Sequence, residues 1–230
     1  MKTIGLLGGM SWESTLSYYK LLNEGVRDAL GGVHSAKIIM QSVDFDKIHQ
    51  LQCAGKWDEA GKILANLAHT LEVGGADCIL ICTNTMHKVA DIIAKKITIP
   101  IIHIADATAK SLIQNKRKKT ILLGTRFTMQ EDFYKKIISS YNIEVVIPSP
   151  KDMKEVDRII FEELVVGKIT KNSKLKYINI IENLCIKNSE IDSVILGCTE
   201  IGLLVKKGDI NLQIFDTTSL HVKEALHFAL

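Results

Sequence analysis

Short apolar runs rich in β-branched residues alternate along the chain with longer stretches whose apolar residues recur every three to four positions. The short runs predict strands and the longer stretches predict helices. Because the runs are apolar throughout, the strands should form parallel sheets that helices cover on both faces, which is an α/β fold. The predicted strands are residues 3–9, 36–43, 77–83, 99–105, 120–125, 143–148, 193–199 and 212–217. The predicted helices include residues 13–30, 57–74, 129–141, 153–166 and 174–188.

The two halves of the chain repeat one another. The segment that starts at Lys2 matches the segment that starts at Lys119, at an offset of 117 residues. The apolar run that starts at Asp77 matches the run that starts at Asp192, at an offset of 115 residues. Two matched pairs at nearly the same separation indicate an internal duplication. We therefore expect two similar α/β halves related by pseudo-twofold symmetry, one of residues 1–97 plus 217–230 and one of residues 98–216.

The repeat also sets a register for two neighbouring residues of the first half. At the offset of 115, Cys198 corresponds to Thr83 and Gly197 corresponds to Cys82. Neighbouring side chains of a strand point to opposite faces, so a step of one residue changes the face. If Cys198 points into a cleft shared by the halves, its counterpart is Thr83. Cys82 is then expected to face the packing side.

Small polar residues follow four of the predicted strands, in segments 8–11, 82–85, 124–128 and 197–200. Parallel α/β folds bind ligands beyond the carboxyl ends of their strands. None of the four segments carries a dinucleotide or P-loop fingerprint, so no large nucleotide cofactor is expected. A cleft between two similar halves can place one acid–base group on each face of a planar intermediate, as racemisation without a cofactor requires. A thiol suits this work, because a helix N-terminus can lower its pKa from about 8.5.

Composition and charge argue against nucleic-acid-binding and membrane-spanning functions. The 230 residues are 47% hydrophobic and 24% charged, which is typical of a globular chain. The net charge of +3 is small, and the basic run 115–120 is typical of a solvated turn, so no nucleic-acid partner is expected. No apolar run is long enough to cross a membrane, and the chain starts without a signal peptide. A cytoplasmic location is therefore expected.

The five cysteines agree with that location. They are odd in number and widely spaced, which argues against a disulfide framework. Cys78, Cys82 and His87 could be imagined as metal ligands, but their spacing matches no usual zinc pattern. No metal is therefore expected.

The segments GLLGGMSWEST, CTNTMH and GCTEIGLL resemble the aspartate/glutamate racemase family, and the resemblance extends over the whole chain, including HIADAT and IIFEEL. It is closest to the bacterial branch that acts on L-aspartate and L-glutamate. The resemblance implies two Rossmann-like halves with the active site in the cleft between them. It also implies a homodimer, an acidic amino acid as substrate, and no cofactor, pyridoxal phosphate included.

The sequence departs from the family pattern at one position. The family usually carries Cys-Asn-Thr in its first half, whereas this chain has Thr83 in place of that cysteine. The second motif, Gly-Cys-Thr-Glu, is intact around Cys198. A hydroxyl is a far poorer base than a thiol but can donate a proton. We therefore expect Cys198, as thiolate, to remove the α-proton and Thr83 to reprotonate the opposite face, with the L enantiomer preferred.

Eight further residues are expected to bind the substrate. By resemblance, Asn84, Thr85, Thr199 and Glu200 line the site and Gln52 contacts the distal carboxylate. The remaining three lie at strand ends: Met10, Ser11 and Thr125. Each of the eight could instead be a helix cap or a turn residue.

Three nearby residues are given other roles. Arg126 is a possible carboxylate clamp, although a surface role fits it equally well. His87 is expected to orient its neighbours rather than to act as the base. Trp12 is expected to pack within the protein.

Two alternative functions stay open. One lies within the superfamily: a hydantoin racemase, a maleate isomerase or a decarboxylase, which also use cysteines at strand ends. The other is an acidic amino-acid-binding protein with little catalysis, because one cysteine is lost. The motifs that start at Gly8 and at Cys82 favour the amino-acid racemase.

Overall fold

The computed structural model describes residues 1–230 and contains two compact units, each built on its own parallel sheet. Unit 1 comprises residues 1–104 and 221–230, and unit 2 comprises residues 105–220. The predicted division at residues 97/98 and 216/217 stays a prediction about the duplicated halves. No helix is both long enough and apolar enough to cross a membrane.

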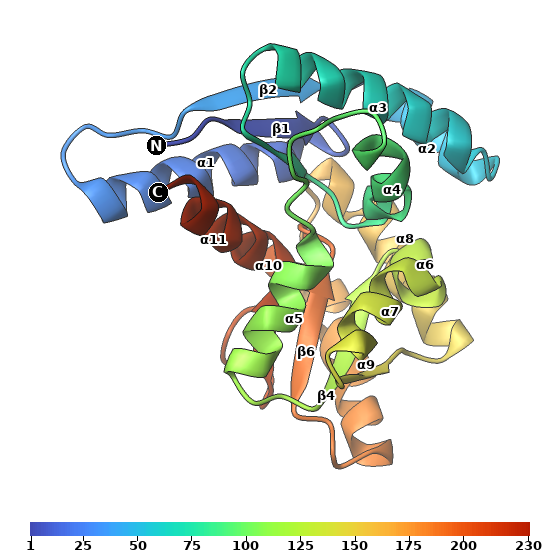
Figure 1. Ribbon diagram of the computed structural model, residues 1–230. Coiled ribbons are helices and arrows are strands. Elements are labelled where there is room, and N and C mark those ends of the chain that lie inside the picture. Colours follow the sequence, from blue (N-terminus) through green and yellow to red (C-terminus); the bar gives the residue numbers. More distant parts are fainter. The chain divides into compact units, whose positions relative to one another are not determined.

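Unit 1 is a three-stranded parallel sheet in the order β2-β1-β3. Its strands are β1 (Ile4–Gly8), β2 (Ile38–Ser42) and β3 (Cys78–Ile81). Its helices are α1 (Trp12–Leu30), α2 (Phe45–Cys53), α3 (Trp57–Val73), the 3-10 turn η1 (Thr85–Val89), α4 (Ala90–Ala94) and most of α11 (Thr217–Ala229). As Figure 1 shows, α1 runs back alongside β1 in the opposite direction.

Alternate residues of the unit 1 strands pack on opposite faces of the sheet. On one face, Leu7 and Ile81 pack against Leu64 of α3. On the other face, the buried cluster contains Leu6 and Leu80 of the strands together with Tyr18, Leu22, Val222 and Ala225 of α1 and α11. Both faces are covered, which explains why the strands read as continuous apolar runs.

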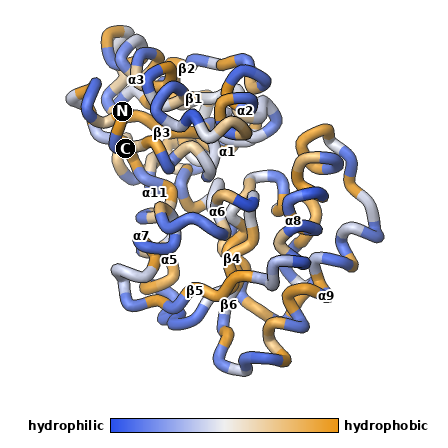
Figure 2. The backbone as a smooth tube through the Cα atoms, turned by 90° about the vertical axis from the view of Figure 1, so that its right-hand side faces the viewer, coloured by the Kyte–Doolittle hydropathy of each residue, from blue (hydrophilic) through white to orange (hydrophobic).

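Unit 2 is a four-stranded parallel sheet in the order β5-β4-β6-β7. Its strands are β4 (Lys119–Gly124), β5 (Glu144–Val146), β6 (Ser193–Gly197) and β7 (Gln213–Asp216). Figure 2 shows the apolar character of the central strands β4 and β6. The helices of this unit are α5 (Ile104–Gln114), α6 (Arg126–Gln130), α7 (Asp132–Ser140), α8 (Pro150–Glu162), the turn η2 (Leu164–Val166), α9 (Lys171–Lys187) and α10 (Ile201–Leu204).

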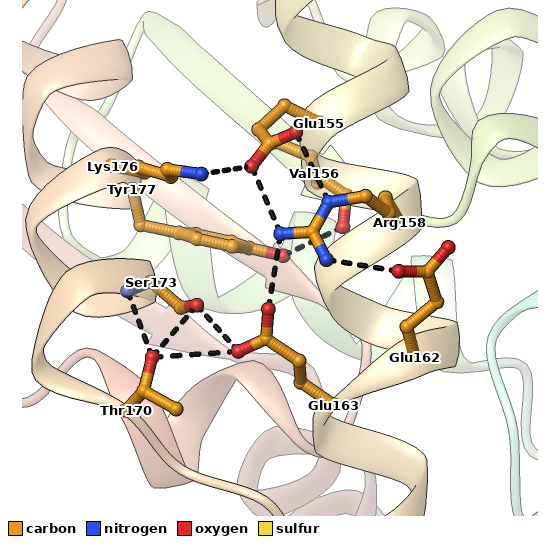
Figure 3. Close-up of polar contacts among 9 residues, drawn as sticks. All are labelled: Glu155, Val156, Arg158, Glu162, Glu163, Thr170, Ser173, Lys176 and Tyr177. Carbon is orange, nitrogen blue, oxygen red and sulfur yellow. Dashed lines mark hydrogen bonds and ion pairs between the residues drawn. The ribbon is translucent and has the colours of Figure 1, made fainter.

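A polar network joins α8 to the segment that leads into α9 (Figure 3). The Arg158 guanidinium donates hydrogen bonds to Glu155, Glu162 and Glu163 at 3.0–3.2 Å. Glu163 is buried and also accepts a hydrogen bond of 2.5 Å from Ser173 Oγ. This bond and, after it, Arg158 lower the pKa of Glu163, so the carboxylate stays charged inside the network. The network fixes two helices that cover the unit 2 core.

The two units use the same device to set the register of their central strands. Asp77 Oδ2 accepts a hydrogen bond of 2.6 Å from the backbone N–H of Thr3, and Asp192 Oδ2 accepts one of 2.8 Å from that of Lys118. Further along, Gly124 pairs with Gly197, and the N–H of Cys82 bonds to the carbonyl of Leu7, beside Gly8. If Asp77 and Asp192 are equivalent, as the offset of 115 predicts, Cys82 corresponds to Gly197 and Gly8 corresponds to Gly124.

This register corrects one of the two predicted offsets. Gly8 and Gly124 are 116 residues apart, so the offset of 117 for the first strands is wrong by one residue. The cause is that Lys119 joins β4, which is one residue longer than β1. The offset of 115, on which this correspondence rests, stays a prediction for the strands that lead to Thr83 and Cys198.

The predicted strand 99–105 is the main error in the secondary structure. Only Ile101 bridges to Ile79, and α5 already begins at Ile104. Pro100 has no N–H to donate, and the N–H groups of Thr98 and Ile99 bond to Glu72 instead of a strand. The segment therefore pairs at a single residue. The predicted helix 129–141 is two helices, α6 and α7, because Glu131 between them has an extended backbone with φ −83° and ψ 158°.

Candidate active site

Cys82 and Thr83 point in different directions at the end of β3. Cys82 is fully buried in the cluster of Leu6, Tyr18 and Leu80, which confirms the prediction that it faces the packing side. Burial raises the pKa of the Cys82 thiol far above its ordinary value, so this thiol is inert. Thr83, in contrast, is partly accessible. It is thus the side chain at this strand end that can meet a ligand.

His87 holds the backbone of Thr83 from behind. His87 Nδ1 lies 2.8 Å from the Thr83 carbonyl oxygen, and His87 Nε2 accepts a hydrogen bond of 3.2 Å from the N–H of Ile104. These partners require a proton on Nδ1 and none on Nε2. Burial, then His103 and His221, lower the pKa of His87 well below its ordinary value. His87 therefore is a neutral group that orients Thr83, as the sequence suggested.

Hydrogen bonds join the start of α1 to the end of β3. Ser14 Oγ donates a hydrogen bond of 2.7 Å to the Cys82 carbonyl, and the N–H of Gly9 bonds to Thr15 Oγ1 at 2.8 Å. The Ser11 hydroxyl caps α1 by accepting a bond of 3.4 Å from the N–H of Ser14. The Met10 side chain is buried in the core beside α3. Any contact of Met10 with a ligand would therefore have to come from its backbone.

The remaining predicted residues of unit 1 gather around the turn η1. Asn84 and Thr85 are buried directly after Thr83. Gln52 is buried on α2, and its Nε2 lies 2.9 Å from Met86 Sδ. A residue from a different helix is thus brought next to the turn that follows Thr83.

In unit 2, Cys198 lies next to a carboxylate. Cys198 is partly accessible, and its thiol donates a hydrogen bond of 3.0 Å to Glu200 Oε2. Thr199 Oγ1 donates to the same oxygen at 2.5 Å. Glu200 itself is buried. The three residues of the Cys-Thr-Glu motif therefore form one hydrogen-bonded group at the end of β6.

These surroundings raise the pKa of Cys198 well above its ordinary value. The first cause is burial, the second is the negative charge of Glu200, and a smaller one is the charge of Asp157. The expectation of a lowered thiol pKa is therefore wrong for this arrangement. The reason is local: α10 after the motif has only four residues, so its dipole is small, and a carboxylate lies between it and the thiol.

The neighbouring strand end carries Thr125 and Arg126. Thr125 follows Gly124, which pairs with Gly197, so Thr125 and Cys198 follow adjacent strands. The Thr125 hydroxyl caps α6 by accepting a bond of 3.3 Å from the N–H of Thr128. Arg126 is exposed, and its side chain lies over the Phe127 ring. Its backbone N–H donates a hydrogen bond to Asp157 Oδ1. Its side chain thus has the surface position that the sequence allowed.

Two groups near these strand ends carry no signal in the sequence. Asp157 reaches the β4 end from α8, about 30 residues along the chain, and no motif marks it. His221 of α11 is buried near His87, with Nδ1 2.8 Å from Tyr18 Oη and Nε2 2.6 Å from the Ile102 carbonyl oxygen. No group of three or more His, Cys, Asp or Glu side chains is arranged to hold a metal ion.

Comparisons with known proteins place the chain in a family. Residues 7–225 match the family model of Asp/Glu/Hydantoin racemases. A Yersinia pestis protein classed as an Asp/Glu racemase has a crystal structure with a TM-score of 0.92, 47% identity, and coverage of 100% of this chain and 99% of that one. PH1733 of Pyrococcus horikoshii OT3, an aspartate racemase homologue, gives a TM-score of 0.87 and 37% identity, with coverage of 100% and 99%.

A curated glutamate racemase is also similar in sequence. The glutamate racemase of Staphylococcus aureus (strain JH9) is 27% identical over 195 residues, which cover 79% of this chain and 70% of the relative. The family model and the two similar structures show that the chain belongs to the Asp/Glu/hydantoin racemase family. It is therefore an isomerase of the amino-acid racemase type.

Proposed function

We propose that this enzyme interconverts the L and D enantiomers of aspartate and glutamate without a cofactor, starting preferentially from L. The observation that carries the proposal is the pair of matching strand ends, one with Thr83 accessible and one with Cys198 bonded to Glu200. The proposal requires both strand ends to reach one substrate from opposite faces. It further assigns the enzyme to the cytoplasm as a homodimer, in keeping with five free cysteines and the family resemblance.

Deprotonation is assigned to Cys198 with Glu200 as its partner. The raised pKa means that Cys198 rests as a thiol, so it must lose a proton before it can act as a base. Glu200 Oε2, at 3.0 Å, is placed to accept that proton. The thiolate then takes the α-proton of the L enantiomer, and the electron pair of the C–H bond moves into the α-carboxyl group.

Reprotonation is assigned to Thr83. Its hydroxyl gives a proton to the α-carbon on the opposite face, which forms the D enantiomer, and it recovers a proton from solvent as Glu200 releases one. A hydroxyl is too weak a base to start the reverse reaction well. Since the enantiomers have equal free energy in solution, the ratio kcat/KM must be equal in both directions. The asymmetry must therefore appear in kcat and KM separately.

Substrate binding is assigned to residues around the two ends. In unit 1 they are Asn84 and Thr85, which directly follow Thr83, and Gln52, whose Nε2 lies 2.9 Å from Met86 Sδ in the same turn. The backbone of Met10 and Ser11, at the start of α1, is suited to a carboxylate because the first N–H groups of a long helix attract anions. In unit 2, Thr125, Thr199 and Glu200 complete the assignment.

Proton NMR of L-aspartate and L-glutamate in D₂O, without added cofactor, tests the proposal. The α-proton signal should disappear with the wild type and with Cys82→Ala, because Cys82 is buried in the core. It should persist with Cys198→Ala. If Cys82→Ala is the inactive variant, the assigned register fails. If the wild type exchanges neither amino acid but converts a hydantoin or maleate, the proposed substrate class is wrong.

A further inference from the structure

Two buried side chains form a polar pair between α1 and α11 in unit 1. Tyr18 lies on the inner face of α1 and His221 lies on α11, and both are fully buried. Tyr18 Oη is 2.8 Å from His221 Nδ1, and the two rings meet edge to face with centroids 5.6 Å apart. Trp12, expected to pack within the protein, is 65% exposed at the start of the same helix. Of these two aromatic residues of α1, Tyr18 therefore makes the buried contact.

The partners of His221 assign the protons of this pair. His221 Nε2 lies 2.6 Å from the Ile102 carbonyl oxygen, which can only accept, so the ring carries a proton on Nε2. Because burial lowers the pKa of His221 to about 3, the ring is neutral at pH 7 and Nδ1 has no proton. Nδ1 must therefore accept a hydrogen bond, and Tyr18 Oη donates it. Tyr18 thus fixes the tautomer of His221, and His221 holds the Ile102 carbonyl.

The segment that His221 holds leads directly to His87. The N–H of Ile102 bonds to a carbonyl of β3 at 3.0 Å, and two residues later the N–H of Ile104 bonds to His87 Nε2 at 3.2 Å. Between these two points, the Ile102 carbonyl accepts the bond from His221. His87 in turn donates from Nδ1 to the Thr83 carbonyl at 2.8 Å. A continuous series of bonded groups therefore runs from α1 and α11 to the end of β3.

This series is suited to holding a backbone position. His221 lies beside the apolar cluster that contains Val222 and Ala225, where an apolar side chain would pack without the cost of burying polar atoms. Each nitrogen of His87 and His221 nonetheless meets a partner of the matching donor or acceptor type. The two imidazole rings also contact each other, with centroids 5.6 Å apart. A buried network that is satisfied in this way restricts its members to one arrangement.

We propose that His221 is a positioning residue for the return of the proton to the substrate. Through residues 102–104 and His87, it holds the backbone of Thr83 and so the direction of the Thr83 hydroxyl. The inference rests on the proposed function, in which Thr83 is the proton donor, and it gives His221 no contact with the substrate. A displacement of about 1 Å can cost on the order of a hundredfold in rate. Loss of His221 should therefore slow donation by Thr83 but not proton removal by Cys198, which belongs to unit 2.

Two rates measured on the full chain with L-aspartate in D₂O test this role. They are the exchange of the α-proton, followed by NMR, and the formation of the D enantiomer, followed by chiral chromatography. His221→Leu should lower D formation about tenfold at saturating substrate and keep exchange within about twofold of the wild type. His221→Gln, whose amide can donate to Ile102 and accept from Tyr18, should restore D formation to within about threefold.

Leu22→Ala is the matched control for a loss of packing. It leaves a cavity in the same buried cluster of α1 and α11 without removing a hydrogen bond. The ratio of D formation to exchange should therefore stay at the wild-type value. Tyr18→Phe keeps the ring and removes the donor to His221, so it should lower the ratio by a smaller factor, about threefold.

A double variant tests whether His221 acts through His87. His87→Leu should lower D formation at least as much as His221→Leu does, because it removes the bond to Thr83 itself. If both residues act through one series of bonds, the double variant should be no slower than His87→Leu alone. Two independent losses of packing would multiply instead.

Nitrogen-15 NMR of the imidazole rings tests the arrangement without any reaction. Wild-type His87 should show a protonated Nδ1 and an unprotonated Nε2, and His221→Leu should move both resonances towards a mixture of tautomers. His221→Gln should leave them unchanged. A wild type that neither exchanges nor inverts acidic amino acids overturns the proposed function, and the His87 resonances then still decide whether His221 holds the segment.

Three results would overturn the inference. The first is a wild-type ratio of D formation to exchange in His221→Leu. The second is a double variant in which the two losses multiply. The third is a set of His87 resonances that His221→Leu leaves unchanged. If His221→Leu fails to fold, as judged by circular dichroism, Tyr18→Phe takes its place, and a wild-type ratio in that variant overturns the inference.

Discussion

The end of β3 in unit 1 and the end of β6 in unit 2 occupy matching places in their sheets, but they surround their functional residue with different chemistry. At β3 the neighbour is His87, which is neutral and bonds to the Thr83 backbone. At β6 the neighbour is Glu200, which accepts a hydrogen bond from the Cys198 thiol itself. The Cys198 side chain therefore has a carboxylate as its hydrogen-bond acceptor, whereas the histidine at the other end contacts the Thr83 backbone.

Under the proposed mechanism, this difference extends the asymmetry beyond the single substitution of cysteine by threonine. At the Cys198 end a carboxylate accepts the thiol proton in a hydrogen bond, whereas His87 contacts Thr83 through its backbone. The base proposed here needs a partner that can take its proton, and Glu200 is the partner proposed for Cys198.

Making the two ends alike should abolish deprotonation. With Cys198→Thr, both ends carry a hydroxyl and no thiolate can form. Exchange of the L-aspartate α-proton in D₂O should fall about a thousandfold, in the range typical for loss of a general base. The measurement is NMR exchange at saturating substrate, with Thr83→Ser as the control that keeps a hydroxyl. Retention of more than a tenth of the wild-type rate would show that another group removes the proton.

Removing the Thr83 hydroxyl should slow the conversion of the L to the D enantiomer while α-proton exchange continues. Thr83→Val keeps the shape of the side chain but cannot donate a proton, so formation of the D enantiomer should fall about a hundredfold. The L enantiomer should still take up deuterium with retained configuration, because Cys198 is untouched. Chiral chromatography measures the first quantity and NMR the second. Equal losses of both would mean that Thr83 does not act as a separate donor.

Acid should destabilise the folded protein through the buried histidine His221 of unit 1. Burial lowers the pKa of His221 to about 3, against an ordinary value of 6.5. The folded state keeps His221 neutral, whereas the unfolded chain binds a proton below pH 6.5. The stability of the folded state is therefore complete above pH 6.5 and is lost as the pH falls towards 3. At pH 4.5, two units below 6.5, the free energy of unfolding should be lower by about 3 kcal/mol.

Denaturant unfolding at pH 7 and pH 4.5 measures this loss. His221→Gln should reduce the difference between the two pH values by about the same 3 kcal/mol, whatever its effect at pH 7. His227→Gln, on the exposed side of the same helix, should leave the difference unchanged. An unchanged pH difference in His221→Gln would mean that His221 is not the group that resists protonation.

The sequence predicted those parts of this comparison that depend on local pattern. The alternation of faces along a strand was enough to separate Cys82 from Thr83, because one step along the chain decides the face. The contacts that set the chemistry lie outside any local pattern. His87 bonds to Ile104 at a distance of 17 residues, and His221 bonds to Ile102 at a distance of 119 residues. The Cys198–Glu200 bond joins neighbours, but its existence depends on side-chain geometry that spacing does not determine.

The Glu200 side chain offers the finest test of the comparison, because its two effects on Cys198 oppose each other. As a charge, Glu200 raises the pKa of the thiol, so Glu200→Gln should lower that pKa and speed alkylation of Cys198 by iodoacetamide at pH 7. As a proton acceptor, Glu200 assists catalysis, so the same change should slow L-aspartate exchange. Partial compensation limits the expected loss to about tenfold.

The opposite signs distinguish a proton-accepting role from a structural one. A merely structural loss at Glu200 would slow exchange and leave alkylation unchanged or erratic, whereas the proposed role makes the thiol more reactive and the enzyme slower at once. Alkylation is followed in a Cys53→Ser/Cys185→Ser background, because Cys53 is exposed and Cys185 is partly accessible, as Cys198 is. Thr199→Val is the matched control: it removes the second hydrogen bond to Glu200 Oε2 but keeps the carboxylate, so the thiol should remain slow to alkylate. If Glu200→Gln accelerates both alkylation and exchange, Glu200 only restrains the thiol, and the proton of Cys198 must leave by another route.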